Sequence, residues 1–384
     1  MKQLGNLSWL WYNCAVGTTG PKDNMHYFRT HTEINLEAIR RNAEAIKAYT
    51  GKRLIAVVKA DAYGHGMSPV AEALYSVADM FAVATVEEGI ELRQNGIHKP
   101  ILILFSSLPE EAAQTVEHQL TPTVADWEFA SRLNIVAPTV VNIHVNINTG
   151  MNRSGVRWTE AAAFLNRLKT LERLEIEGAF THLATADEAD KSFVSVQLER
   201  FSSVFAGRRP KMLHAANSAA SLAISASHFD AIRPGLSLYG VYPASEKPIA
   251  LEPALTWKSR IGWVGSISER EGVSYGLTYK ASRQSRVAMV QIGYGDGYPR
   301  ALSDVGEVLI GGVRCQIIGR ICMDVSVAEL SDAADALVGD EVVLIGKQGE
   351  EEIAVGEIAG RAETISYEIL TQIGPRVKRI FKNQ

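Results

Sequence analysis

The sequence predicts an α/β protein with an N-terminal (β/α)8 barrel of the TIM type, followed by a mainly β C-terminal domain. The chain has 384 residues, more than one average domain requires. Short β-branched runs alternate with helical patterns from about residue 50, and glycine-punctuated β runs dominate after about residue 250. We therefore expect a disordered extension over residues 1–26, a barrel over 27–252 and a β domain over 253–384.

The barrel is predicted from eight short apolar runs that alternate with longer helical segments. The expected strands cover residues 54–60, 80–85, 101–105, 121–125, 140–147, 176–183, 212–217 and 231–235. Helical periodicity over 86–97, 160–171 and 193–207 fills intervals between these strands. Eight strand–helix repeats favour a closed parallel barrel, with an open doubly wound sheet as the alternative.

The C-terminal part has a different texture, in which glycines interrupt β-branched runs. These runs are SRIGWVGSI (259–267), SRVAMVQIGYGDGY (285–298), EVLIGGVRCQIIG (307–319) and EVVLIGKQG (341–349). Such segments are typical of a β domain, and we place the boundary near Glu252 and Pro253.

Composition excludes several classes of function. A hydrophobic fraction of 46% is that of an ordinary globular protein, and a net charge of −4 provides no basic surface for nucleic acid or anionic membranes. The three cysteines, Cys14, Cys315 and Cys322, fit neither a disulfide framework nor a metal site. We expect a cytoplasmic protein without a bound metal.

The first residues contain a short apolar stretch, Leu7–Val16, interrupted by Ser8 and Asn13. A secretory signal is the alternative interpretation, but only Lys2 precedes the stretch. No run of about 20 apolar residues is present, so we expect no membrane span.

Lys59 is the first candidate for chemistry, because an apolar run delivers it to the end of the first barrel strand in VVKADAYGHG (57–66). Active sites of these barrels lie at the C-terminal ends of the strands. Burying an ammonium group is costly, and an imine with an aldehyde removes that cost. The alternative is a lysine that extends to the surface.

Other strand ends carry polar residues with two interpretations each. The segment IRPGLSLYG (232–240) contains a glycine turn whose N–H groups can bind phosphate. The alternative is that Arg233 is a structural residue before an ordinary turn. Ser218 can cap a helix or bind an anion at its N-terminus. His182, in FTHLATADE (180–188), taken alone is better explained as a structural residue.

The run Ala-Tyr-Gly-His-Gly after Lys59 resembles the lysine motif of the alanine racemase family, and the resemblance covers nearly all of residues 27–384. It implies a barrel followed by a β domain, pyridoxal phosphate as the cofactor, and a homodimer with shared active sites. It also implies interconversion of L- and D-alanine, which supplies D-alanine for peptidoglycan.

The resemblance assigns roles to the barrel residues. Lys59 carries the cofactor and acts as one acid/base, Arg233 faces the pyridine nitrogen, and His182 hydrogen-bonds that arginine. The residues expected to bind phosphate are Tyr63, Ser218, Gly235, Leu236 and Tyr367. Because an arginine does not give up its proton, the ring nitrogen of the cofactor stays unprotonated. An unprotonated ring favours rapid return of a proton to the substrate Cα.

The resemblance also assigns roles outside the lysine and phosphate residues. Tyr275, in GVSYGLTY (272–279), is the second catalytic base, although a half-buried strand aromatic is the default for any tyrosine. Tyr294 narrows the substrate entry, and the Met323 N–H contacts the substrate carboxylate. Arg153 supports the phenolic oxygen of the cofactor and orients that carboxylate.

The sequence departs from the family at two positions beside Arg153. Many members have a lysine, often carbamylated, where Asn146 stands, and an aspartate where Asn148 stands. An asparagine supplies no charge. We expect an amide hydrogen bond from Asn146 to hold Arg153, with or without a bound halide.

Three rivals remain. A serine or broad-specificity racemase is compatible with Asn146, whereas Tyr294 and Tyr367 favour alanine. A fold-related decarboxylase normally offers the ring nitrogen an acid rather than Arg233. A non-catalytic protein of pyridoxal phosphate homeostasis resembles a single barrel, so residues 253–384 count against it.

Overall fold

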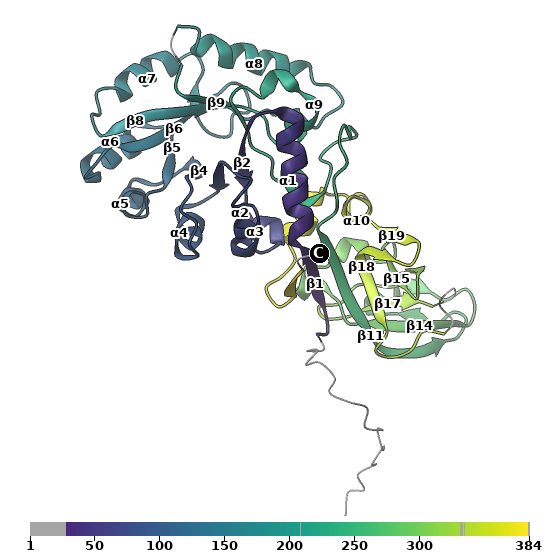
Figure 1. Ribbon diagram of the computed structural model, residues 1–384. Helices are drawn as coiled ribbons and strands as arrows, with labels where there is room; N and C mark the ends of the chain where they lie inside the picture. Colours follow the sequence, from purple (N-terminus) through teal and green to yellow (C-terminus); the bar gives the residue numbers. More distant parts are fainter. Residues whose placement is uncertain (1–27, 208, 331–332, 334, 383–384) are drawn as a thin grey trace, which may run out of the picture.

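The computed structural model describes residues 28–382 except 208, 331–332 and 334, and its ribbon shows a barrel and a β domain side by side (Figure 1). The predicted extension over residues 1–26 lies outside the described residues. Within the described residues, no helix is long and apolar enough to cross a membrane.

Eight parallel strands form the predicted barrel, because β5 also pairs with β6 and closes the sheet order β5-β4-β3-β2-β10-β9-β8-β6. The strands are β2 (Arg53–Val57), β3 (Met80–Val83), β4 (Ile101–Ser106), β5 (Thr121–Val124), β6 (Val141–Asn148), β8 (Leu174–Phe180), β9 (Met212–His214) and β10 (Ala231–Ile232). The short β7 (Val156–Arg157) adds to β6. The open-sheet alternative is therefore wrong.

One helix precedes the first barrel strand, and the others lie between successive barrel strands, as the periodicity predicts. They are α1 (Leu36–Thr50), α2 (Lys59–Gly64), α3 (Met67–Ala73), α4 (Val86–Gln94), α5 (Ala112–Glu117), α6 (Trp127–Val136), α7 (Ala161–Leu168), α8 (Ser192–Val204) and α9 (Ser218–Ala223). Asn35 caps α1 by accepting the Ala38 N–H, and Gly51 ends it with a φ of +64°.

The second domain is mainly β, as expected. Its large sheet contains β1 (His31–Asn35), β11 (Leu255–Ile267), β14 (Ser285–Val290), β15 (Glu307–Ile310), β16 (Val313–Gln316), β17 (Ser326–Glu329), β18 (Glu341–Gln348), β19 (Glu351–Ile353) and β20 (Lys378–Lys382). A small ribbon of β12 (Gly272–Val273) and β13 (Tyr279–Lys280) and the helices α10 (Val355–Arg361) and α11 (Ser366–Thr371) complete the domain.

The strand β1 precedes the barrel in sequence but lies in the sheet of the second domain. It runs antiparallel to β11 and parallel to β20. The helix α1 then leads from this sheet to the barrel (Figure 1), and its buried Asn42 bonds the backbone of Leu238 and Glu252. These bonds fix the connection between the two domains, because a buried amide is costly to leave unpaired.

Candidate active site at the mouth of the barrel

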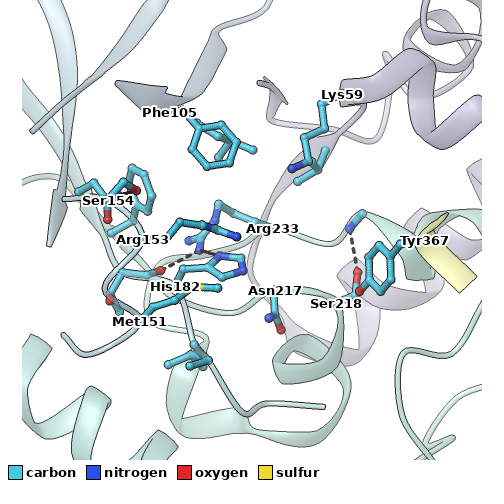
Figure 2. A pocket seen from close by; sticks show the side chains of 18 of the residues that line it. Lys59, Phe105, Met151, Arg153, Ser154, His182, Asn217, Ser218, Arg233 and Tyr367 are labelled. Atoms are coloured by element: carbon cyan, nitrogen blue, oxygen red, sulfur yellow. Dashed lines mark hydrogen bonds between the residues drawn. The ribbon is translucent and has the colours of Figure 1, made fainter. Parts of the chain in front are cut away.

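A cavity of about 540 Å³ opens at the C-terminal ends of the barrel strands (Figure 2). Eight of the twelve predicted site residues line it, seven from the barrel and Tyr367 from α11 of the second domain. They are Lys59, Tyr63, Arg153, His182, Ser218, Arg233, Gly235 and Tyr367. The cavity therefore combines cationic groups with phenols and a glycine turn. Leu236 is buried beside Gly235 and does not line the cavity.

Lys59 stands at the start of an unusual turn rather than at the end of a strand. The strand β2 ends at Val57, and residues 60–63 have φ angles of 52–55°. A non-glycine residue in this left-handed region costs roughly 1–2 kcal/mol. Bonds from Ala62 N to Val58 O (2.8 Å) and from Gly66 N to Asp61 O (2.9 Å) offset part of that cost. The turn fixes the backbone from which the lysine extends.

The Lys59 amine lies near a second cation. Its Nζ is 5.2 Å from the Phe105 ring centroid, and the guanidinium carbon of Arg153 is also 5.2 Å from that centroid. Burial and, to a lesser degree, Arg153 lower the pKa of Lys59, while Glu88 opposes them. A lowered pKa increases the fraction of unprotonated amine, which is the form that attacks an aldehyde.

A cradle for an anion lies beside the lysine. The Ser218 Oγ accepts the N–H groups of Gly235 (2.8 Å) and Ser237 (3.3 Å), which leaves its own proton for another acceptor. A Cβ on Gly235 would lie 2.3 Å from the Tyr63 hydroxyl, so the glycine makes space for that phenol. The Tyr367 ring packs 5.9 Å from the Tyr63 ring.

The interpretation of Ser218 as a helix cap is wrong. Asn217 caps α9, because its side chain accepts the Ala220 N–H at 3.0 Å. The Ser218 hydroxyl is consequently free to face the turn after β10, where it meets Gly235. The N-terminal end of the short helix α9, at Asn217 and Ser218, also lines the cavity.

Arg233 is buried in a cluster of neutral histidines. Its Nη1 bonds His214 Nδ1 at 2.6 Å, and its Nη2 donates to Thr181 O at 2.8 Å and contacts His182 Nδ1 at 3.4 Å. Burial and then Arg233 lower the pKa of His182 to about 3. His182 is therefore neutral at neutral pH, and the guanidinium carries the positive charge.

The tautomer of the next histidine follows from this arrangement. An arginine can only donate, so His214 accepts at Nδ1 and carries its proton on Nε2. That proton is donated to His144 Nδ1 at 2.8 Å. The two histidines orient Arg233 without adding a positive charge.

The expected amide bond between Asn146 and Arg153 is wrong. The Asn146 amide donates to Ser154 Oγ at 2.9 Å instead. The Asn148 Oδ1 accepts the N–H groups of Gly150 and Asn152, so both asparagines shape the loop. Among the described residues no carboxylate pairs with Arg153, because the family's lysine and aspartate positions here hold neutral amides. The bound halide stays a prediction.

Three of the four predicted site residues of the second domain do not line the cavity of their own chain. Tyr275, Tyr294 and Met323 belong to the second domain and are 72%, 44% and 54% exposed. They lie close together, because Tyr294 N donates to Cys322 O and Ser274 Oγ contacts Cys322 Sγ. The interpretation of Tyr275 as a half-buried strand aromatic is wrong.

Sequence reasoning missed three residues near the lysine. Phe105 ends a predicted strand, so its position at the barrel mouth was available from the sequence. Glu88 lies three residues after the cap Thr85 of α4, which suggested only an ordinary helix start. His214 carries no sequence signal that separates it from a core histidine.

Comparison with known families settles the membership of the chain. The model of the family "Alanine racemase, N-terminal domain" matches residues 34–243, and that of "Alanine racemase, C-terminal domain" matches residues 254–381. The chain belongs to the alanine racemase family. The family predicted from the lysine motif is thereby confirmed.

Individual relatives are similar in sequence and in structure over nearly the whole chain. The alanine racemase of Halothermothrix orenii is 41% identical over 368 residues, covering 92% of this chain and 97% of the relative. A crystal structure of alanine racemase from Bacillus anthracis with bound L-Ala-P has a TM-score of 0.87 and 37% identity, covering 94% of this chain and 96% of that chain. The alanine racemase structure from E. faecalis has a TM-score of 0.88 and 34% identity, covering 92% of this chain and 98% of that chain.

Alanine racemases depend on pyridoxal phosphate, so the cofactor predicted from the sequence is confirmed. The cavity fits this cofactor group by group. It offers an amine at Lys59 for an aldehyde, a cradle of Ser218, Gly235 and Tyr63 that suits a phosphate, and the buried cation of Arg233.

Proposed function

We propose that the protein is an alanine racemase that interconverts L- and D-alanine with two acid/base groups, Lys59 and Tyr275, contributed by different subunits of a homodimer. The observation that carries this proposal is the position of Lys59. It lies in one cavity with an anion cradle on one side and a buried arginine on the other. When bound, pyridoxal phosphate spreads the negative charge that forms at the amino acid Cα.

Each barrel residue then has a defined task. Lys59 holds the cofactor and moves the proton on the D-alanine side, and Arg153 orients the substrate carboxylate. Arg233 donates to the ring nitrogen and keeps its own proton, which favours return of a proton to Cα over transamination. The phosphate is bound by Tyr63, Ser218, Gly235 and the backbone N–H of Leu236, and by Tyr367 from the second domain.

The second base comes from another copy of the chain. Stereochemical inversion needs a proton carrier on each side of Cα, and among the described residues we assign Lys59 to one side. Tyr275 is 72% exposed in its own chain, as expected for a residue that completes the site of a partner. In the dimer it moves the proton on the L-alanine side, Tyr294 narrows the entry, and the Met323 N–H contacts the substrate carboxylate.

The tyrosine must lose its proton to act as a base, and a nearby cation favours the phenolate form. In the partner's site, the Arg233 cation stabilises the phenolate. We expect His182 to lie between Arg233, which it contacts, and the partner's tyrosine. It remains neutral, because burial lowers the pKa of His182 to about 3.

The test is to incubate the purified protein with pyridoxal phosphate and separate L-amino acids, then measure D-enantiomers by chiral chromatography. We expect racemisation of alanine, its loss in Lys59→Ala, and a severe deficit with retained cofactor binding in Tyr275→Phe. Tyr279→Phe is the matched control, because the Tyr279 hydroxyl faces Glu329. Absence of D-alanine from the wild type contradicts the proposal.

The same assay separates the rivals. Comparable D-serine formation favours a broad-specificity racemase, and carbon dioxide release favours a decarboxylase. Cofactor-dependent absorbance without any racemisation favours a protein of pyridoxal phosphate homeostasis. We place the activity in the cytoplasm, where its product serves peptidoglycan synthesis, with residues 27–252 as the cofactor domain and 253–384 as the donor of the second base.

A further inference from the structure

Glu88 makes two backbone contacts that ordinary helix capping does not explain. It is the third residue of α4, and its own N–H is bonded by the cap residue Thr85. In a capping box the carboxylate at this position accepts the N–H of the cap residue. Here Glu88 Oε2 accepts the N–H of Ala84 at 2.7 Å, and Oε1 accepts the N–H of Ala60 at 2.7 Å.

The second contact reaches the residue after the lysine. Ala60 is the first residue of the left-handed turn, and its amide adjoins the Cα of Lys59. At the far end of the turn, Arg379 donates to Gly64 O at 3.2 Å. At the lysine end the anchor is Glu88, from the first turn of the helix α4. Among the described residues, Glu88 is the partner outside the turn that the N–H of Ala60 bonds.

We propose that Glu88 is a positioning residue for Lys59, whose carboxylate clamps the first peptide of the left-handed turn and directs the amine into the cavity. This inference rests on the proposed function, because it assigns the turn a task in presenting the cofactor lysine. Residues 60–63 hold a conformation that alanine and tyrosine disfavour, so an external clamp on the Ala60 amide determines where the lysine begins.

The charges around the amine make this role measurable. The groups that face Lys59 are Arg153 from the loop after β6, His182 from the end of β8, and Glu88 from α4. His182 is neutral, so Glu88 is the negative charge among these groups and raises the pKa of Lys59 against burial and Arg153. Replacing Glu88 by glutamine removes that charge, and the Lys59 pKa then falls further.

The experiment compares Glu88→Gln, Glu88→Ala and the control Glu87→Gln. Glu87 lies in the same first turn of α4 and has the same charge, but it makes no hydrogen bond to the lysine turn in the described part of the chain. The cofactor-free protein is pulse-labelled with acetic anhydride across pH, and the Lys59 peptide is quantified by mass spectrometry. The rate of pyridoxal phosphate binding is measured separately by absorbance.

We expect the labelling midpoint of Lys59 to fall by about half a pH unit in Glu88→Gln and to stay unchanged in Glu87→Gln. Cofactor binding slows about tenfold in Glu88→Gln, because the loss of positioning outweighs the larger fraction of unprotonated amine, and it slows further in Glu88→Ala, which loses both acceptors. The glutamine keeps one acceptor oxygen, so this variant retains the fold if Glu88→Ala does not.

A Glu88→Gln protein with the labelling midpoint and cofactor-binding rate of the Glu87→Gln control overturns the inference. That result is distinct from failure of the proposed function, in which the wild type itself forms no D-alanine. The labelling midpoint reports on Glu88 in either case, because it is measured without the cofactor.

Discussion

Substituting Gly235 with alanine probes the anion cradle directly. Gly235 has a φ of −121°, outside the left-handed region, so the added methyl group acts through its contacts. Its Cβ would lie 2.3 Å from the Tyr63 hydroxyl and 2.8 Å from Cζ, where ordinary contact begins at 3.4 Å. The phenol must therefore retreat by about 1 Å, a displacement that breaks a hydrogen bond. A bond to a charged phosphate is worth about 1.5–3 kcal/mol, which corresponds to roughly 10- to 150-fold weaker cofactor binding.

The assay is titration of the cofactor-free variant with pyridoxal phosphate, followed by absorbance. Gly360→Ala is the control, because this helical glycine has nothing within 4 Å of a built Cβ. We expect the control to bind like the wild type. A dissociation constant of Gly235→Ala within about twofold of the wild-type value refutes the placement of the phosphate at this turn.

Further predictions concern stability. Burial lowers the pKa of His65 to about 4, of His144 and His182 to about 3, and of His214 well below its usual value. Below about pH 6.5 the unfolded chain binds protons on these side chains and the folded chain does not, so stability falls towards pH 4 by roughly 1 kcal/mol per pH unit for each histidine. Urea midpoints measured between pH 7 and 5 check this, and a constant midpoint contradicts it. Asp296 is buried and pairs with two arginines, at 2.9 and 2.6 Å, and we expect Asp296→Asn to lose about 3 kcal/mol of unfolding free energy in urea melts. Wild-type stability in that variant would show that the pairs contribute nothing.

The barrel could be predicted because its strands and helices follow simple periodicities. The eight expected strands all exist, and the strand 101–105 differs from β4 by one residue. The strand expected over 54–60 ends at Val57 instead, because the chain then enters the left-handed turn. No local preference of Ala60 or Tyr63 favours that conformation, so contacts from elsewhere in the fold must impose it.

Contacts between distant segments explain the remaining differences. Residues 31–35 pair with β11, more than 200 positions away, and nothing in their sequence indicates which strand they pair with. The Asn146 amide bonds Ser154 rather than Arg153, because the conformation of the loop after β6 determines which side chain it reaches. Likewise, the motif around Tyr275 predicts a catalytic residue, but the motif does not predict that this side chain is exposed and lies outside the cavity of its own chain.

The central claim is that each site joins Lys59 of one chain with Tyr275 of another. Its most direct test is to mix the inactive Lys59→Ala and Tyr275→Phe proteins under conditions that exchange subunits, and to measure racemisation of alanine. Half of the randomly formed dimers then hold one intact site out of two, so the account predicts recovery of about a quarter of wild-type activity. A mixture no more active than its two components contradicts the claim.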